Sequence, residues 1–146
     1  MLAVETNVLV YAHRREVEEH AIANELLRGL AEGSERWAIP WPCVYEFASV
    51  VTNRRIWKAA ASTPSEAWSQ LGAWQASPSC RLIGETEDFF DLLERFLRRS
   101  RVAGPVVHDA RIAAICVAHG VEALLTRDRD FSLFPELALR NPFARR

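Results

Sequence analysis

Residues 1–11 read MLAVETNVLVY, an apolar run that three polar residues, Glu5, Thr6 and Asn7, interrupt. Short apolar runs are typical of strands that are buried on both faces of a parallel sheet. The apolar residues resume at Val8, which fits a turn that leads directly into a helix. We therefore predict a buried strand that ends at a polar site and is followed by a helix.

Further along the chain, short apolar segments alternate with apolar residues at helical spacing. The segments predict four more strands, at residues 37–39, 81–83, 123–125 and near 137–139. Helices are expected over residues 17–30, 43 to about 54, and 107–119, with two more that begin near residues 63 and 86. This alternation is typical of an α/β domain with a mainly parallel central sheet of about five strands. The length fits a single domain over residues 1–146.

Several local signals mark where the helices begin, end and face the core. Thr63-Pro64-Ser65-Glu66 is a capping box with proline at the first helical position. Thr86 is a second candidate cap, and Gly120 is a candidate helix stop. The predicted buried positions include Ile22 in helix 17–30, and Val44, Phe47, Ala48 and Val51 in the following helix.

Composition excludes several classes of protein. Eighteen basic and nineteen acidic residues give a formal charge of −1, unlike the strongly basic surface of a protein that coats nucleic acid. Three widely spaced cysteines form neither a disulfide framework nor a zinc site, and are expected to be small core residues in a reducing compartment. We find no signal peptide and no apolar run long enough to span a membrane, and we expect a cytoplasmic protein.

Five acidic residues occur where a charge needs an explanation. Glu5 ends the first predicted strand, and Asp128 and Asp130 follow the strand at 123–125. Glu46 interrupts a buried helical stripe, and Asp109 lies in the first turn of helix 107–119. All of them except Glu5 have a structural explanation: Asp109 can complement a helix dipole, Asp128 or Asp130 can cap a turn, and Glu46 can be solvated.

The strand topology offers a functional explanation for the same acids. If the strands at 1–4 and 123–125 are neighbours, their following acids meet at the carboxyl edge of the sheet, where sites collect in open α/β sheets. Carboxylates that share one cleft repel one another unless their pKa values rise or a cation binds. Oxygen ligands without a grouping of histidine and cysteine favour Mg²⁺ or Mn²⁺.

Four motifs in order resemble those of PIN-domain ribonucleases, particularly VapC-type toxins of toxin–antitoxin pairs. The resemblance extends to about residue 134, and its motifs are MLAVETNVLVY (1–11), VYEF (44–47), HDARIAA (108–114) with Gly120, and TRDRDF (126–131). It implies a Rossmann-like, three-layer PIN fold and a metal-dependent endoribonuclease that hydrolyses RNA phosphodiester bonds. It also implies a cognate VapB-like antitoxin and a homodimer.

The resemblance assigns roles to particular residues. The acids of the Mg²⁺ or Mn²⁺ site would be Glu5, Glu46, Asp109 and Asp128, with Asp130 as a supporting ligand. Asn7 and Thr126 would orient carboxylates or bound waters by hydrogen bonds. Three arginines beside these acids either hold RNA phosphates or balance charge within the acidic cluster: Arg111, Arg127 and Arg129.

One residue departs from the family pattern, in which the first acid is aspartate. Glu5 keeps the charge but moves the carboxylate outward by roughly 1.5 Å, about one carbon–carbon bond. Because metal sites tolerate misplacement poorly, we hypothesise that Glu5 lowers activity. The alternative is a PIN fold that binds RNA or protein with little catalysis. A nucleotide-cofactor or receiver domain is disfavoured, since the chain has neither G-x-G-x-x-G nor a P-loop.

Overall fold

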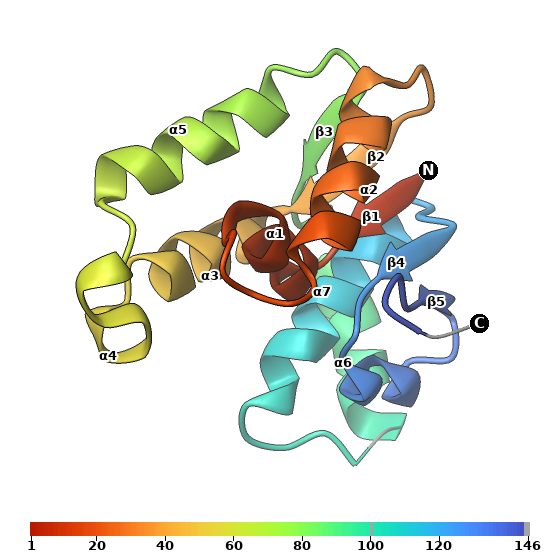
Figure 1. Cartoon of the computed structure of the whole chain (residues 1–146). Helices are drawn as coiled ribbons and strands as arrows, with labels where there is room; N and C mark the ends of the chain where they lie inside the picture. Colours follow the sequence, from red (N-terminus) through yellow and green to blue (C-terminus); the bar gives the residue numbers. More distant parts are fainter. Residues whose placement is uncertain (100, 145–146) are drawn as a thin grey trace.

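A computed structural model describes residues 1–99 and 101–144, and within these residues it shows a five-stranded sheet whose strand pairings are parallel (Figure 1). Along the sheet the strands have the order β3-β2-β1-β4-β5. Their bounds are β1 Leu2–Val4, β2 Trp37–Pro40, β3 Cys80–Ile83, β4 Ala123–Leu125 and β5 Leu139–Arg140. The α/β class and the parallel sheet of five strands are confirmed. The last strand begins two residues later than the sequence predicts.

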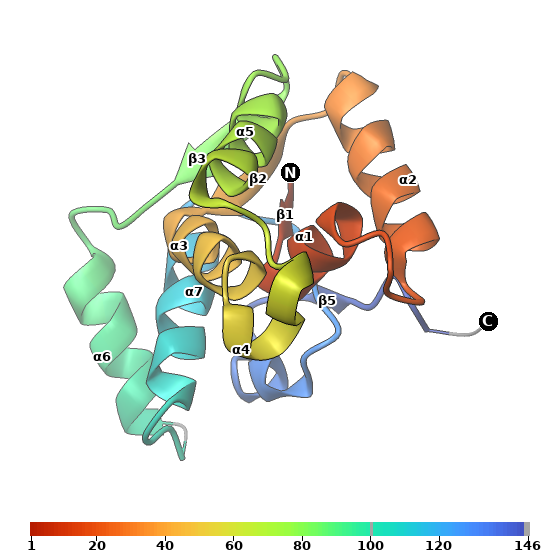
Figure 2. The same ribbon diagram turned by 60° about the vertical axis from the view of Figure 1, so that its left-hand side comes forward.

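Helices connect the strands and cover both faces of the sheet. The bounds are α1 Thr6–His13, α2 His20–Glu32, α3 Trp41–Val51, α4 Arg54–Trp57, α5 Pro64–Gln75, α6 Phe89–Arg99 and α7 Val106–Ala118, with 3₁₀ helices η1 Lys58–Ala60 and η2 Arg129–Leu133. Figure 2 shows α6 and α7 on one side of the strands and α2 on the other. The result is the three-layer arrangement that the sequence predicts.

The chain order explains where a site can form. The chain passes from β1 to β2 and β3 on one side, then returns to place β4 against the other side of β1. Strand order therefore reverses between β1 and β4, and the loops that follow these two strands diverge there. In open α/β sheets such a reversal leaves a crevice beyond the carboxyl ends of the strands.

The core is built from the predicted apolar positions. Val44, Phe47 and Val51 of α3 are buried, and so are Ala110, Ala113 and Ala114 of α7. The three cysteines are free thiols inside this core, as expected. Among the residues that the structure describes, no helix combines the length and apolar character needed to cross a lipid bilayer.

Two helix predictions have wrong boundaries. α2 begins at His20 rather than residue 17, because residues 15–19 form turns and a bend, and the His20 Nδ1 atom bonds the Tyr11 carbonyl oxygen at 2.9 Å. Ile22 is 51% exposed, whereas Ala23 and Leu27 of the same helix face the core. The spacing of apolar residues predicts which face of a helix packs on the core only where enough of the helix is buried.

The sequence predicts that the helix continues to about residue 54, but the segment after α3 is more complex. α3 ends at Val51, and the Asn53 side chain accepts a 2.9 Å hydrogen bond from the Arg55 amide and so begins a new helix, α4. Lys58, the residue after α4, has φ = 56°, the only positive φ of a residue other than glycine in the described chain. These turns escape prediction because they contain neither proline nor glycine.

The capping predictions have opposite outcomes. Thr63 and Glu66 form the complete capping box of α5: the Glu66 amide donates to Thr63 Oγ1 at 3.1 Å, and the Thr63 amide donates to Glu66 Oε2 at 3.3 Å. The Thr86 prediction is wrong. Its hydroxyl is buried without a hydrogen-bond partner, and α6 begins three residues later, at Phe89. Gly120 ends α7 with φ = 65°, a conformation that glycine adopts readily.

Candidate metal centre

Glu5 is placed by the backbone at the point where strand order reverses. β1 and β4 are hydrogen-bonded neighbours, with Val4 opposite Leu125. The Glu5 amide then donates to the Leu125 carbonyl oxygen at 3.1 Å, which extends the ladder by one residue. Glu5 therefore stands at the end of β1, directly beside the residue that follows β4, Thr126.

The Glu5 side chain is buried and caps the helix that follows it. Its Oε2 accepts hydrogen bonds from the Asn7 amide at 3.3 Å and from Thr126 Oγ1 at 3.1 Å, and only 6% of the residue is exposed. Burial, with a smaller contribution from the charges of Glu46 and Asp128, raises the pKa of Glu5 to about 7. The two hydrogen bonds act in the opposite direction, because they stabilise the carboxylate.

Thr126 connects Glu5 with the loop that carries Asp128 and Asp130. Its Oγ1 donates to Glu5 and accepts a 3.0 Å hydrogen bond from the Asp128 amide. Asp128 in turn caps η2, since its Oδ1 accepts from the Asp130 amide at 2.9 Å. The capping explanation for Asp128 thus holds, and the cap also sets the direction of its carboxylate.

Asp109 completes a compact group of three aspartates. It lies in the first turn of α7, and one carboxylate oxygen from each of Asp109, Asp128 and Asp130 lies within 4.8 Å of the other two. The pKa of Asp109 is raised to about 6, first by desolvation and then by the charges of Asp128, Asp130 and Glu46. Segments about twenty residues apart thereby converge at one edge of the sheet.

Glu46 lies outside this group of three but within its electrostatic field. It is carried by α3, and its Oε2 accepts a 2.7 Å hydrogen bond from Thr6 Oγ1. Its charge contributes to the raised pKa values of both Glu5 and Asp109. Thr6 was not singled out in the sequence, although its place between Glu5 and Asn7 at the break in the apolar run is a signal that could have identified it.

The three predicted arginines differ in their partners. Arg127 forms an ion pair with Glu19, and Arg111 forms one with Glu85, so both pair with acids outside the cluster. Arg129 has no ion pair among the residues that the structure describes. No arginine in the described ranges neutralises the three aspartates through an ion pair.

The donor set fits a hard divalent cation. All the candidate ligand atoms are carboxylate oxygens, which Mg²⁺ and Mn²⁺ prefer. Asn7, whose amide donates to Glu5, provides a second observation: its Oδ1 is buried without a hydrogen-bond partner, and such an orphaned acceptor fits a site that is completed by an ion and its waters. The expected role of Asn7 as an orienting group remains a prediction.

The raised pKa values predict how the stability of the metal-free protein changes with pH. Glu5 and Asp109 have higher pKa values in the folded chain than their ordinary values of 4.5 and 3.8, so the folded state binds more protons than the unfolded state up to about pH 7. The free energy of unfolding therefore falls as pH rises through this window, by about 2 kcal/mol from Glu5 alone. We expect the melting temperature in EDTA to drop by roughly 5 °C between pH 5 and pH 8.

Circular dichroism at a series of pH values measures this effect. The Glu5→Gln variant is the control, because an uncharged side chain at this position removes the Glu5 contribution and flattens the profile. A wild-type profile as flat as that of Glu5→Gln would contradict the raised pKa of Glu5.

Comparison with known proteins gives consistent matches over nearly the whole chain. The family model of the PIN domain matches residues 2–137. Ribonuclease VapC43 of Mycobacterium tuberculosis is 34% identical over 142 residues, which cover 97% of this chain and 95% of that protein. Among solved structures, VapC20 of M. tuberculosis, described as a toxin that cleaves the sarcin–ricin loop, has a TM-score of 0.66 at 20% identity and covers 90% of this chain and 93% of its own. VapBC2 of Rickettsia felis, solved with a DNA fragment from its promoter, has a TM-score of 0.66 at 19% identity and covers 96% of this chain and 97% of its own.

Proposed function

Because the chain belongs to the PIN-domain family, with VapC ribonucleases among its relatives, we propose that it is a metal-dependent endoribonuclease toxin of a toxin–antitoxin pair. The observation that carries the proposal is the group of three aspartates whose oxygens lie within 4.8 Å of one another at the carboxyl edge of the sheet. We further propose that residues 1–146 form one PIN domain that acts in the cytoplasm.

We assign the ion, Mg²⁺ or Mn²⁺, to Asp109, Asp128 and Asp130, with Glu5 and Glu46 as the remaining acids of the site. A bound ion of this kind supplies Lewis acidity toward a phosphodiester and lowers the pKa of a water molecule. The catalytic set would be Glu5, Glu46, Asp109 and Asp128.

The neighbouring hydroxyl groups hold the acids in place. The Thr126 hydroxyl donates a hydrogen bond to Glu5 and accepts one from the Asp128 amide, so one side chain links two of the proposed site residues. Thr6 Oγ1 donates a hydrogen bond to Glu46. Fixed hydrogen bonds of this kind keep carboxylates in one orientation, which a metal site requires.

The arginines contribute differently to this proposal. Arg129 is available for an RNA phosphate, because it has no ion pair within the described residues. Arg111 and Arg127 can reach RNA only by leaving Glu85 and Glu19, and both of these ion pairs are partly exposed. Exposed ion pairs are weak, so such an exchange costs little.

The proposed partners are an RNA substrate, a VapB-like antitoxin and a second copy of this chain. The antitoxin follows from the relatives, several of which were solved as toxin–antitoxin complexes. An alternative function is a PIN-fold module that binds RNA or protein with little catalysis. The observation that favours it is the long side chain of Glu5, whose Oε2 is engaged by Asn7 and Thr126.

Removal of the metal tests the proposed activity. We expect the purified chain to cleave RNA with Mg²⁺ or Mn²⁺ and to lose this activity in EDTA, with recovery when the ion is added back in excess. Isothermal titration with Mg²⁺, at pH 8 and at pH 6, is the second measurement. Affinity should be lower at pH 6, because Glu5 is then largely protonated and Asp109 about half protonated in the metal-free protein.

The two measurements separate the alternatives. Saturable metal binding without cleavage of any RNA would favour the binding module. Cleavage that persists in EDTA, or no saturable binding at either pH, would contradict the metal site itself.

A further inference from the structure

Three basic residues lie close together on the segment that the sequence had failed to predict. Arg54, Arg55 and Lys58, the only lysine in the chain, belong to α4 and the first residue of η1. All three are exposed, and none has an ion pair with an acid in the described ranges. Ile56, between them, is 53% exposed. We define this group of three cations as the basic segment.

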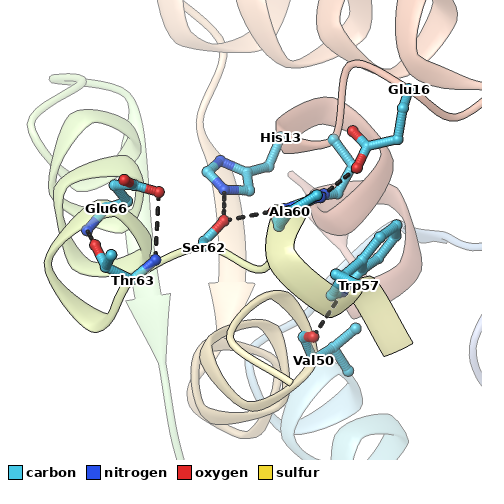
Figure 3. A network of polar contacts seen from close by, with 9 residues as sticks. His13, Glu16, Val50, Trp57, Ala60, Ser62, Thr63 and Glu66 are labelled. Carbon is cyan, nitrogen blue, oxygen red and sulfur yellow. Dashed lines mark hydrogen bonds and ion pairs between the residues drawn. The ribbon is translucent and has the colours of Figure 1, made fainter. Parts of the chain in front are cut away.

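A buried arginine contacts the residues that surround the basic segment in the chain. Arg14, at the end of α1, is 6% exposed, and its guanidinium lies 4.2 Å from the centre of the Trp57 ring. The same guanidinium donates to Ser62 Oγ at 3.2 Å and to the Ala60 carbonyl oxygen at 2.9 Å, and it forms an ion pair with Glu16. Figure 3 shows this network around Ser62 and Ala60.

Two further contacts fix the segment to the rest of the domain. The Trp57 indole N–H donates to the Val50 carbonyl oxygen of α3 at 2.8 Å, and His13 Nε2 lies 2.8 Å from Ser62 Oγ (Figure 3). Lys58, which lies in the chain between Trp57 and Ala60, has a positive φ of 56°. Backbone conformations of this kind persist only where the surroundings hold them, and they concentrate at functional sites.

The basic segment is connected to the two helices at which Glu5 and Glu46 lie: it follows α3 in the chain, and its neighbour Trp57 packs on Arg14 at the end of α1. α1 has Glu5 at its beginning and Arg14 at its end, and α3 carries Glu46 and leads into the segment. At 1.5 Å per helical residue, the five residues from Glu46 to Val51 span about 8 Å. The three residues from Val51 to Arg54 add at most roughly 11 Å, so the Arg54 backbone lies within about 20 Å of the Glu46 backbone, a separation that a short stretch of RNA backbone can bridge.

Electrostatics explains why such cations are needed. Five carboxylates at this site repel a polyanion, and of the three nearby arginines Arg111 and Arg127 are engaged in ion pairs, which leaves Arg129 to offset the five charges. A phosphate backbone that approaches the acids requires positive charge outside the cluster. Arginine provides paired donors for phosphate oxygens, and lysine provides a mobile point charge.

We propose that the basic segment binds the phosphate backbone of the RNA substrate and thereby positions the strand over the acidic site. This inference rests on the proposed ribonuclease function and adds a substrate-binding surface to it. Arg54, Arg55 and Lys58 would be positioning residues, and Arg14 would hold the segment in place.

Equilibrium binding and steady-state kinetics on the full chain test the proposal. The variant is Arg54→Ala/Arg55→Ala, and the control is Arg28→Ala/Arg36→Ala, which removes the same charge from exposed positions on α2 and before β2. Binding of a fluorescein-labelled single-stranded RNA is measured by anisotropy in EDTA over a range of salt concentrations. Cleavage of the same RNA with Mg²⁺ gives kcat and KM.

We expect the variant to bind RNA about tenfold more weakly than the control, with KM raised and kcat little changed. The slope of log Kd against log salt should fall by about 1.4, or 0.7 for each lost contact to a single strand. Arg54→Lys/Arg55→Lys, which keeps both charges, should retain most of the slope. This second variant also shows whether the first effect reflects charge rather than folding.

The outcomes distinguish this inference from the proposed function. If the wild-type chain cleaves RNA but the variant matches the control in Kd, KM and slope, the basic segment is not an RNA surface. If RNA binding depends on the segment and no cleavage occurs, the inference stands and the nuclease proposal fails. If the variant loses binding to poly-glutamate but not to RNA, the surface serves an acidic protein and the proposal is overturned.

Discussion

The Asp109→Asn variant is expected to lower RNA cleavage with Mg²⁺ by about 10³-fold. Asparagine has nearly the same size as aspartate, so the substitution removes a charge and leaves the packing of α7 in place. Asp109 is one of three residues whose oxygens lie within 4.8 Å of one another, and its loss leaves only two such carboxylates in the described cluster. Groups that act directly in catalysis are typically worth 10²- to 10⁴-fold.

Stability should change in the opposite direction. The pKa of Asp109 is raised to about 6 by burial and by Asp128, Asp130 and Glu46, so its ionised form destabilises the metal-free fold at pH 8. Asp109→Asn should therefore melt at a higher temperature than the wild type in EDTA at pH 8. A variant that is both inactive and more stable has not lost activity by misfolding.

Asp88→Asn is the matched control, because Asp88 is exposed and precedes α6. Its cleavage rate and melting temperature should equal those of the wild type. Full activity of Asp109→Asn would exclude Asp109 from the site, and equal losses in the two variants would show that general charge on the protein matters rather than the cluster.

The Glu5→Asp variant is expected to raise kcat, by up to roughly 10²-fold. Glutamate is not among the residues favoured as helix N-caps, whereas aspartate is. In the structure, Glu5 Oε2 lies within hydrogen-bond distance of both the Asn7 amide and Thr126 Oγ1, and the side chain lies outside the group of three aspartates. A carboxylate that is displaced by about 1 Å can cost a factor of 10² in rate.

Two measurements check this prediction. The first is kcat with Mg²⁺ for the wild type and Glu5→Asp, and the second is Mg²⁺ affinity from calorimetric titration. Glu46→Asp is the control, because it shortens another acid of the site and should lower activity by breaking the hydrogen bond from Thr6. An unchanged or lower kcat in Glu5→Asp, with unchanged metal affinity, would refute the hypothesis that Glu5 attenuates the enzyme.

The sequence alone determined the features that depend on near neighbours along the chain. Alternating strands and helices, the α5 capping box and the Gly120 stop follow from local periodicity and backbone preference, and the structure confirms them. The position of Glu5 at the end of β1 follows as well, because a polar residue ends a buried strand. The sequence could not establish that β1 and β4 are neighbours, because parallel strands are joined by long crossovers and strands far apart in the chain can pair.

The tertiary structure sets which side chains meet. It brings Asp109 together with Asp128 and Asp130, pairs Arg111 and Arg127 with acids elsewhere, and gives Glu46 its partner Thr6. It also braces α4 against Arg14, a residue some forty positions earlier. Periodicity and helix caps depend on residues within one or two turns of the chain, so they can be predicted from the sequence. These contacts depend instead on how distant elements pack and on how far individual side chains reach.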